Sequence, residues 1–139
     1  MRSKWIAILI KSALIFVLYL GYLQYGCDMD VSGSYSIASN NYHEERFSVV
    51  VNKLYVPDPK SCAYEIIRRC RQNSFKSIRF SYEWSIPNAL YVTVYASKKQ
   101  MERGKPLFSF SYLSEEVNGS YNIIDDPEHY ILNIDEKKK

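Results

Sequence analysis

Glycine, proline and histidine are scarce in this chain. Its 139 residues include 5 glycines, 5 prolines and 2 histidines. So few glycines and prolines exclude collagen-like and broadly disordered chains. No glycine-rich phosphate-binding loop and no G-x-S-x-G turn of a hydrolase is present. The length fits one domain and excludes a large multidomain enzyme.

Cysteine patterns that bind metals are also missing, because Cys27, Cys62 and Cys70 form no C-x-x-C pair. Cys62 and Cys70 fall on one expected helix, where eight residues rise about 12 Å, beyond the reach of a disulfide. We expect both to be buried small hydrophobic residues, and we predict no metal ion or other cofactor. An oxygen-rich cation site made from residues 43–45 and 125–129 stays open as an alternative.

The net charge of +3 comes from the first 26 residues, which hold three basic residues and no acidic one. From residue 27 onward, 15 basic residues balance 15 acidic ones, so the charge is no evidence for nucleic acid binding. Residues 53–105 carry 11 basic and 4 acidic side chains, whereas residues 106–136 carry 7 acidic side chains and no lysine or arginine. We interpret this segregation as surface solvation; strand pairing and oppositely charged faces are the alternatives.

Residues 1–26 are predicted to be a signal peptide or a signal-anchor helix. Arg2 and Lys4 precede an apolar run that Lys11 interrupts, and acidic residues follow it. This polarity favours a cell-membrane location with the N-terminus inside and the domain outside, secretion being the alternative. The 21 residues from Trp5 to Tyr25 can span a bilayer if the Lys11 amine snorkels to the inner interface. A buried helix of a soluble protein is disfavoured, because the run is apolar on every side.

Three fates of this leader remain open: an uncleaved anchor, lipidation at Cys27 after cleavage, and ordinary cleavage. Gly26 followed by Cys27 is similar to the end of a bacterial lipobox, although Leu23 stands one place early and Tyr25 is bulky. Gln24 fits a signal-peptidase site poorly. We favour the uncleaved anchor.

The rest of the chain divides into a polar linker (27–44), an α+β domain (45–136) and a basic tail (137–139). Residues 59–72 are predicted to form a helix, with Asp58 as its cap, Pro59 at its first position and an apolar stripe at three- and four-residue spacing. Ser97 and Gly104 bound a short helical turn.

Strands are expected where apolar and polar residues alternate. They lie at residues 46–56, 77–84, 90–95, 108–112, 121–124 and 130–134, with one weak strand at 34–37 in the linker. Asn118-Gly119 and Asp125-Asp126-Pro127 mark turns. One helix and short connections predict an α+β layer, in which the helix packs on a sheet of four to six mainly antiparallel strands.

The outer face of this sheet is the best candidate binding surface, with Arg79, Tyr91, Thr93 and Tyr95 as its main residues. The alternation also places four serines there: Ser77, Ser81, Ser109 and Ser111. Tyrosine, of which the chain has 13, combines flat apolar area with a hydroxyl group, which suits glycans and peptides. The alternative is an ordinary solvated β face, where tyrosine and threonine are favoured anyway.

Four segments carry a recognisable sequence: Asn73–Ser81 (NSFKSIRFS), Pro87–Leu90 (PNAL), Gly104–Phe108 (GKPLF) and Tyr121–Ile124 (YNII). Together they resemble a group of uncharacterised small exported, membrane-anchored proteins of Gram-positive gut bacteria. The similarity covers roughly residues 45–135. The resemblance implies a bacterial protein outside the cytoplasm; it implies no activity, since none is known for the group, and no site residues.

We therefore expect a membrane-tethered extracytoplasmic binding or accessory domain without catalytic activity. Its partners are the membrane, through residues 1–26, and a protein, peptide or cell-wall glycan. The first alternative is a structural subunit of an envelope assembly, in which Lys11 and the tyrosines of the leader face protein. The second is a small cell-envelope hydrolase, because serines are plentiful enough to complete a triad with a histidine and an acid.

Overall fold

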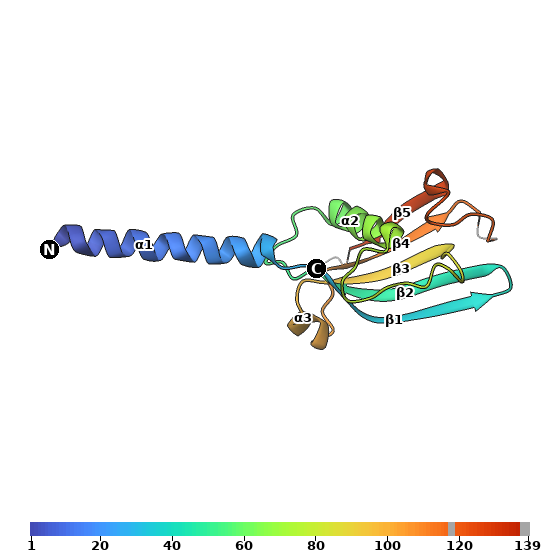
Figure 1. Cartoon of the computed structure of the whole chain (residues 1–139), viewed down its shortest axis with the longest axis horizontal. Helices are drawn as coiled ribbons and strands as arrows, with labels where there is room; N and C mark the ends of the chain where they lie inside the picture. The colour runs from blue at the N-terminus through green and yellow to red at the C-terminus, as the bar shows by residue number, and fades with distance from the viewer. Residues whose placement is uncertain (117–118, 137–139) are drawn as a thin grey trace.

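The computed structural model of the whole chain shows a long helix that projects away from an α+β domain (Figure 1). The structure describes residues 1–116 and 119–136. Helix α1 (Arg2–Gly21) continues as a π-helical turn (Tyr22–Gly26). The most apolar 18-residue window of this span has a mean hydropathy of 2.2, and none of that window is buried against the domain. Its length and composition suffice to cross a membrane and fit an anchor or a signal sequence.

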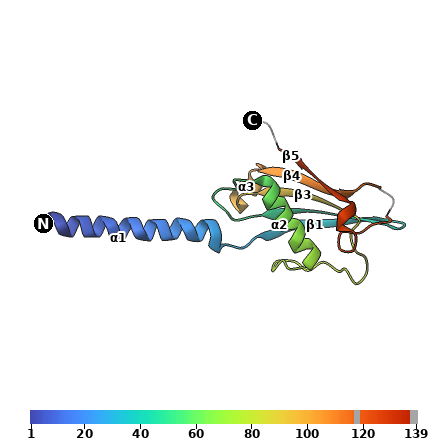
Figure 2. The same cartoon turned by 90° about the horizontal axis from the view of Figure 1, so that it is seen from above.

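The domain is built on one open five-stranded sheet. The strands are β1 (Asp30–Ser39), β2 (Tyr42–Val50), β3 (Ala89–Tyr95), β4 (Phe108–Ser114) and β5 (Tyr130–Asp135), in this order across the sheet. Neighbours are antiparallel except for the parallel pair β2 and β3. A parallel pair needs a long crossover, and here the crossover contains α2 (Pro59–Gln72), which lies across one face of the sheet (Figure 2). The expected α+β architecture is confirmed.

Helix α2 forms where the sequence predicts it. The Asp58 carboxylate accepts a hydrogen bond from the backbone N–H of Lys60 at 3.1 Å, and Asn73 ends the helix in the left-handed conformation at φ 52°. Its buried stripe is Ala63, Ile66, Ile67 and Cys70. Cys70 is buried as expected, whereas Cys62 is half-buried.

The core lies between α2 and the sheet. Alternate residues of the central strands are buried there, and they include Phe47, Val49, Val92, Val94, Phe108 and Phe110. Full burial of each such side chain stabilises the fold by about 1.5–3 kcal/mol. The loop after α2 adds Phe75 and Phe80, whose rings lie 6.4 Å and 5.5 Å from that of Phe47.

The strand expected at residues 77–84 is absent from the described structure, and that prediction is wrong. The segment is an irregular loop on the α2 side of the sheet. Its alternation arises because Phe80 is buried and Tyr82 packs against the core, while Arg79 and Ser81 face water. Tyr82 donates its hydroxyl to the carbonyl of Cys70 at 2.5 Å, which holds the loop on α2. Arg79 is therefore not on the outer sheet face.

The linker expected at residues 27–44 is also corrected, since it supplies β1 and the start of β2. Gly33, at φ 68°, lies at a register shift between Ser32 and Ser34. The strand expected at 46–56 lies at 42–50, because Asn52 adopts φ 54° and leaves the extended conformation.

Residues 121–124 form a turn rather than the expected strand. Asn122 accepts hydrogen bonds from the N–H groups of Ile124 and Asp125 at 3.0 Å and 2.8 Å. Strands β3, β4 and β5 and the short helix α3 (Lys98–Glu102), which follows its Ser97 cap, confirm the other predictions. The Asn118-Gly119 turn and the 137–139 tail involve residues outside the described ranges.

Candidate functional site

The face of the sheet opposite α2 is polar, and two rows of residues run across its strands. The first row crosses all five strands. The strand register joins Tyr35, Arg46, Tyr91, Ser111 and Asn133 in this row. Because side chains alternate along a strand, residues two places away share the same face. The second row contains Ser48, Thr93, Ser109 and Asp135.

These two rows line a pocket of about 470 Å³, which we call the sheet-face pocket. Pockets that hold small ligands commonly enclose about 300–1,000 Å³. Hydroxyl, amide, carboxylate and guanidinium groups alternate over its floor, so a ligand meets hydrogen-bond donors and acceptors along its whole length.

Arg46 is the one basic residue among those that line this pocket. Its guanidinium carbon lies 4.2 Å from the ring centroid of Tyr91, and its Nε donates to Oε1 of Glu44 at 2.8 Å. In the part of the chain that the structure describes, the two terminal nitrogens of Arg46 have no hydrogen-bond partner. The guanidinium is therefore fixed over the Tyr91 ring, and its two terminal nitrogens are available to a ligand.

Glu44 is buried and couples Arg46 to Tyr42. The Tyr42 hydroxyl donates to Oε2 of Glu44 at 3.2 Å. Burial, followed by this carboxylate, raises the pKa of Tyr42 to about 12, so the phenol stays a proton donor at neutral pH. Both oxygens of Glu44 are thus occupied, which fixes the direction of Arg46.

Some of the residues predicted for the outer sheet face line this pocket, and others lie elsewhere. Tyr91, Thr93, Ser109 and Ser111 line the pocket, and Tyr95 lies on the same strand face beyond it. Ser77, Arg79 and Ser81 belong instead to the loop after α2. The missed residues are Tyr35, Arg46, Ser48, Asn133 and Asp135. The alternation of Arg46 and Ser48 with buried Phe47 and Val49 is the signal that predicts two of them.

A second site lies where β2 begins, on the α2 side. His43 Nδ1 is 3.0 Å from the hydroxyl of Ser85, and His43 Nε2 is 2.7 Å from Oε1 of Glu45. Ser36 donates to the same Glu45 oxygen. The histidine and glutamate side chains are 13% and 9% exposed, whereas Ser85 is exposed. With the proton on Nε2, His43 donates to Glu45 and accepts the Ser85 hydroxyl, which polarises that hydroxyl.

This serine–histidine–glutamate chain borders a pocket of about 310 Å³ that Arg79 and Trp84 also line. Asn88 holds His43 in place: its side-chain oxygen accepts the His43 N–H and its own N–H donates to the His43 carbonyl, both at 2.7 Å. Sequence analysis left such a triad open without identifying its serine, because Ser85 follows His43 by 42 residues.

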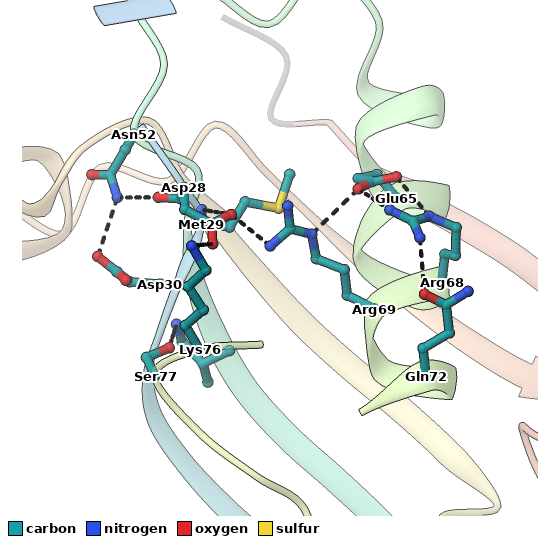
Figure 3. Close-up of polar contacts among 11 residues, drawn as sticks. Asp28, Met29, Asp30, Asn52, Glu65, Arg68, Arg69, Gln72, Lys76 and Ser77 are labelled. Carbon is teal, nitrogen blue, oxygen red and sulfur yellow. Dashed lines mark hydrogen bonds and ion pairs between the residues drawn. The ribbon is translucent and has the colours of Figure 1, made fainter. Parts of the chain in front are cut away.

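A third polar cluster lies where α1 enters the domain (Figure 3). Asp28 accepts a hydrogen bond from Nη1 of Arg69 at 2.6 Å, and Lys76 lies 3.7 Å from its other oxygen. Burial alone would raise the pKa of Asp28, but the hydrogen bonds from Arg69 and from the Met29 N–H, with the two positive charges, lower it.

Glu65 connects the two arginines of this cluster. It pairs with Arg68 at 2.5 Å and with Arg69 at 3.2 Å, and the hydrogen bond from Arg68, followed by that from Arg69, lowers the pKa of Glu65. The cluster borders a pocket of about 650 Å³, which we call the helix-exit pocket. Cys27 also lines it, with its sulfur 3.9 Å from the carbonyl of Tyr22.

The described residues contain no group of three histidine, cysteine, aspartate or glutamate side chains placed to hold a metal ion. His129, from the second predicted acidic cluster, instead stacks on Tyr121 at 3.9 Å between ring centroids. The cation site that the sequence left open is therefore not assembled within these residues.

Comparison with known proteins gives no match among protein-family models, curated proteins or solved structures. The resemblance to exported proteins of Gram-positive bacteria stays a prediction, and the functional argument depends on the geometry.

Proposed function

We propose that this protein is a membrane-tethered, outward-facing binding domain without catalytic activity, and that it binds its ligand in the sheet-face pocket. The observation that carries the proposal is Arg46, which lies over the Tyr91 ring, lines that pocket, and has two terminal nitrogens without a hydrogen-bond partner among the described residues. A planar guanidinium binds a carboxylate through two parallel hydrogen bonds. We therefore propose a ligand that combines a carboxylate with hydroxyl or amide groups, as cell-wall glycan fragments do.

The rest of the pocket fits the same chemistry. Thr93, Ser109 and Ser111 offer hydroxyl groups, and Asn133 offers an amide, at the spacing of adjacent strands. Tyr35 is 60% exposed at the edge of the row and offers a ring on which a sugar can stack. A peptide or a folded protein partner on this face would be the other outcome of the test below.

The test compares two exposed tyrosines on opposite faces of the domain. Tyr35 lines the pocket, whereas Tyr64 is 48% exposed on α2. A stacked ring contributes about 1–1.5 kcal/mol, so Tyr35→Ser should weaken binding to purified cell wall about tenfold. Tyr64→Ser should leave binding unchanged. Equal binding by the wild type and both variants would remove the sheet-face pocket from consideration.

The tether is proposed to be the uncleaved helix α1, with residues 1–26 in the membrane. Intact-mass measurement on the membrane fraction of a Gram-positive host distinguishes the three fates. The full-length mass supports the anchor, whereas residues 27–139 with diacylglycerol on Cys27 would mean a lipoprotein. A truncated, lipid-free mass in the medium would overturn the tether. Co-purification of membrane proteins that needs residues 1–26 would instead favour the envelope-subunit alternative.

A small hydrolase is the second candidate, favoured by the chain from Ser85 through His43 to Glu45. Such a chain activates a serine hydroxyl for attack on an ester or amide carbonyl. The hydrolase requires that the wild type releases acid from a simple aryl ester and that Ser85→Ala abolishes this release. Ser85 is exposed, so its loss leaves the core intact. Absence of turnover by the wild type would exclude the candidate.

A further inference from the structure

The end of the long helix is fastened to one loop of the domain. The side-chain amide of Gln24 donates to the carbonyl of Tyr55 at 2.6 Å and accepts the N–H of Tyr55 at 2.9 Å. The loop thus lies directly against the last turn of the apolar span. It carries Leu54 and Tyr55, whose side chains are 56% and 69% exposed.

The helix length places this loop at the depth of lipid headgroups. The 25 residues from Arg2 to Gly26 rise about 37 Å, and the hydrocarbon core of a bilayer is about 30 Å thick. Tyr22 and Tyr25 lie exposed in the last turn, where tyrosines commonly mark the membrane interface. Leu54 and Tyr55 then meet the interface rather than bulk water.

Basic side chains lie beside the last turn of the apolar helix, close to the loop that carries Leu54 and Tyr55. The helix-exit pocket is lined by Tyr25 and Cys27 together with four basic and two acidic side chains: Lys53, Arg68, Arg69, Lys76, Asp28 and Glu65. The two carboxylates are directed mainly at Arg69 and Arg68. Lys76 is 85% exposed, and among the described residues Lys53 has no side-chain partner. The pocket therefore has two cations in excess, and lysines able to bind phosphate.

We propose that the helix-exit side of the domain docks on the bilayer from which α1 emerges. Leu54 and Tyr55 enter the interface, and Lys53 and Lys76 bind the phosphates of anionic lipid headgroups. The proposal rests on the proposed function in one respect, that α1 spans the membrane. Near an anionic surface each cation contributes about fivefold to association.

Docking would fix the direction of the ligand site. The strands run roughly along α1, and the turn between β1 and β2 lies at the far end of the domain (Figure 1). A domain docked at the helix exit holds the sheet upright, so the sheet-face pocket opens sideways over the membrane surface. A domain swinging on a flexible stalk would present that pocket in every direction.

The experiment uses the full chain in vesicles whose brominated lipids quench nearby tryptophan. The chain has two tryptophans, Trp5 in α1 and Trp84 beside His43 at the far end of the sheet. Trp84→Phe leaves Trp5 as a reporter of helix insertion, and Trp5→Phe leaves Trp84 as a control. A third protein combines Trp5→Phe and Trp84→Phe with Tyr55→Trp. Its one tryptophan, at position 55, reports docking of the loop.

We expect strong quenching of Trp5 and none of Trp84 in every vesicle. The Tyr55→Trp protein should be quenched more in vesicles of three parts phosphatidylcholine to one part phosphatidylglycerol than in phosphatidylcholine alone. Replacing Lys53 and Lys76 by Gln should reduce this difference at least about threefold, because two cations are lost. Arg79→Gln, three residues from Lys76 in the same loop, is the matched control and should change nothing.

The outcomes separate the two proposals. Quenching of Trp5 without any effect of lipid charge or of the two lysines on the Tyr55→Trp signal would overturn docking and leave the tether standing. Absence of Trp5 quenching would overturn the tether, and docking with it. High salt should weaken the charge-dependent part of the signal, since it screens exposed charges.

Discussion

The side-chain amide of Asn73 makes two hydrogen bonds with the backbone of Phe80. Its Nδ2 donates to the Phe80 carbonyl at 2.8 Å, and its Oδ1 accepts the Phe80 N–H at 2.9 Å. Asn73 also ends α2 in the left-handed conformation. One residue thus stops the helix and closes the following loop, which places the Phe80 ring against Phe47 in the core.

Replacing Asn73 should separate these two roles. Asn73→Gly keeps the left-handed conformation but loses both hydrogen bonds, and we expect it to lower the free energy of unfolding by about 1–3 kcal/mol. Asn73→Ala should cost about 1 kcal/mol more, because alanine is strained at positive φ. Urea unfolding of the detergent-solubilised chain measures both. Equal stability of wild type and Asn73→Gly would show that the loop closes without this amide.

The same contact explains why one strand was predicted wrongly. Alternation at residues 77–84 shows only that the segment has one buried side and one exposed side. A strand has two such sides, and so does a loop that lies on the core. The backbone N–H of Phe80 bonds to the Asn73 side chain rather than to a neighbouring strand. The segment contacts β1 through a side chain, since the Ser77 hydroxyl accepts the N–H of Val31 at 2.8 Å. Helix α2 was predicted correctly because its signals, Asp58 and Pro59 included, act within a few residues.

The residues of the sheet-face pocket also differ in how far they could be predicted from the sequence. Some follow from patterns within one strand, and others depend on contacts between strands. Tyr91 and Thr93 follow from alternation along one strand. Alternation can also assign Arg46 to the outer face, but the positions of Arg46 beside Tyr91 and of Tyr35 beside Arg46 depend on the strand register, which no local pattern specifies. The polar composition of residues 28–44 predicted only a weak strand at 34–37, which lies within the longer β1, since an exposed edge strand needs few apolar residues.

Asn88 should be one of the most costly polar residues to replace. It is buried, bonds twice to the backbone of His43, and donates to the Tyr121 carbonyl at 2.6 Å. Asn88→Ala keeps the backbone bond to the His43 carbonyl, but it leaves the His43 N–H without its acceptor and removes the amide donor to the Tyr121 carbonyl. We therefore expect about 3 kcal/mol of destabilisation in urea unfolding. Tyr130→Phe, which removes a hydroxyl donated to the Asn88 carbonyl at 2.7 Å, should cost about 1 kcal/mol. A smaller effect for Asn88→Ala than for Tyr130→Phe would contradict this ranking.

The half-buried and buried cysteines should resist alkylation. Burial raises the pKa of the Cys62 thiol to about 11, so about one molecule in a thousand carries its thiolate at pH 8. Burial raises the pKa of Cys70 as well. Iodoacetamide followed by peptide mass mapping should label Cys62 slowly, and about tenfold faster for each pH unit up to its pKa. Fast labelling of Cys70 in the folded chain would contradict its place in the core, and labelling in urea is the control.

The pair of Asp28 and Arg69 should make the domain sensitive to acid. The pKa of Asp28 is lower in the folded chain than its ordinary value near 3.8, so the pair stabilises the fold above that value and is lost as pH falls through the folded pKa. At pH 7 we expect Asp28→Asn to cost about 1 kcal/mol, since the pair is partly exposed, and the difference from wild type should shrink as the pH falls below 3.8 and Asp28 becomes protonated. Urea unfolding at several pH values measures this. Asp30→Asn is the matched control, because Asp30 accepts a hydrogen bond from Asn52 rather than forming an ion pair. A penalty for Asp28→Asn that is constant with pH would refute the electrostatic origin of the contact.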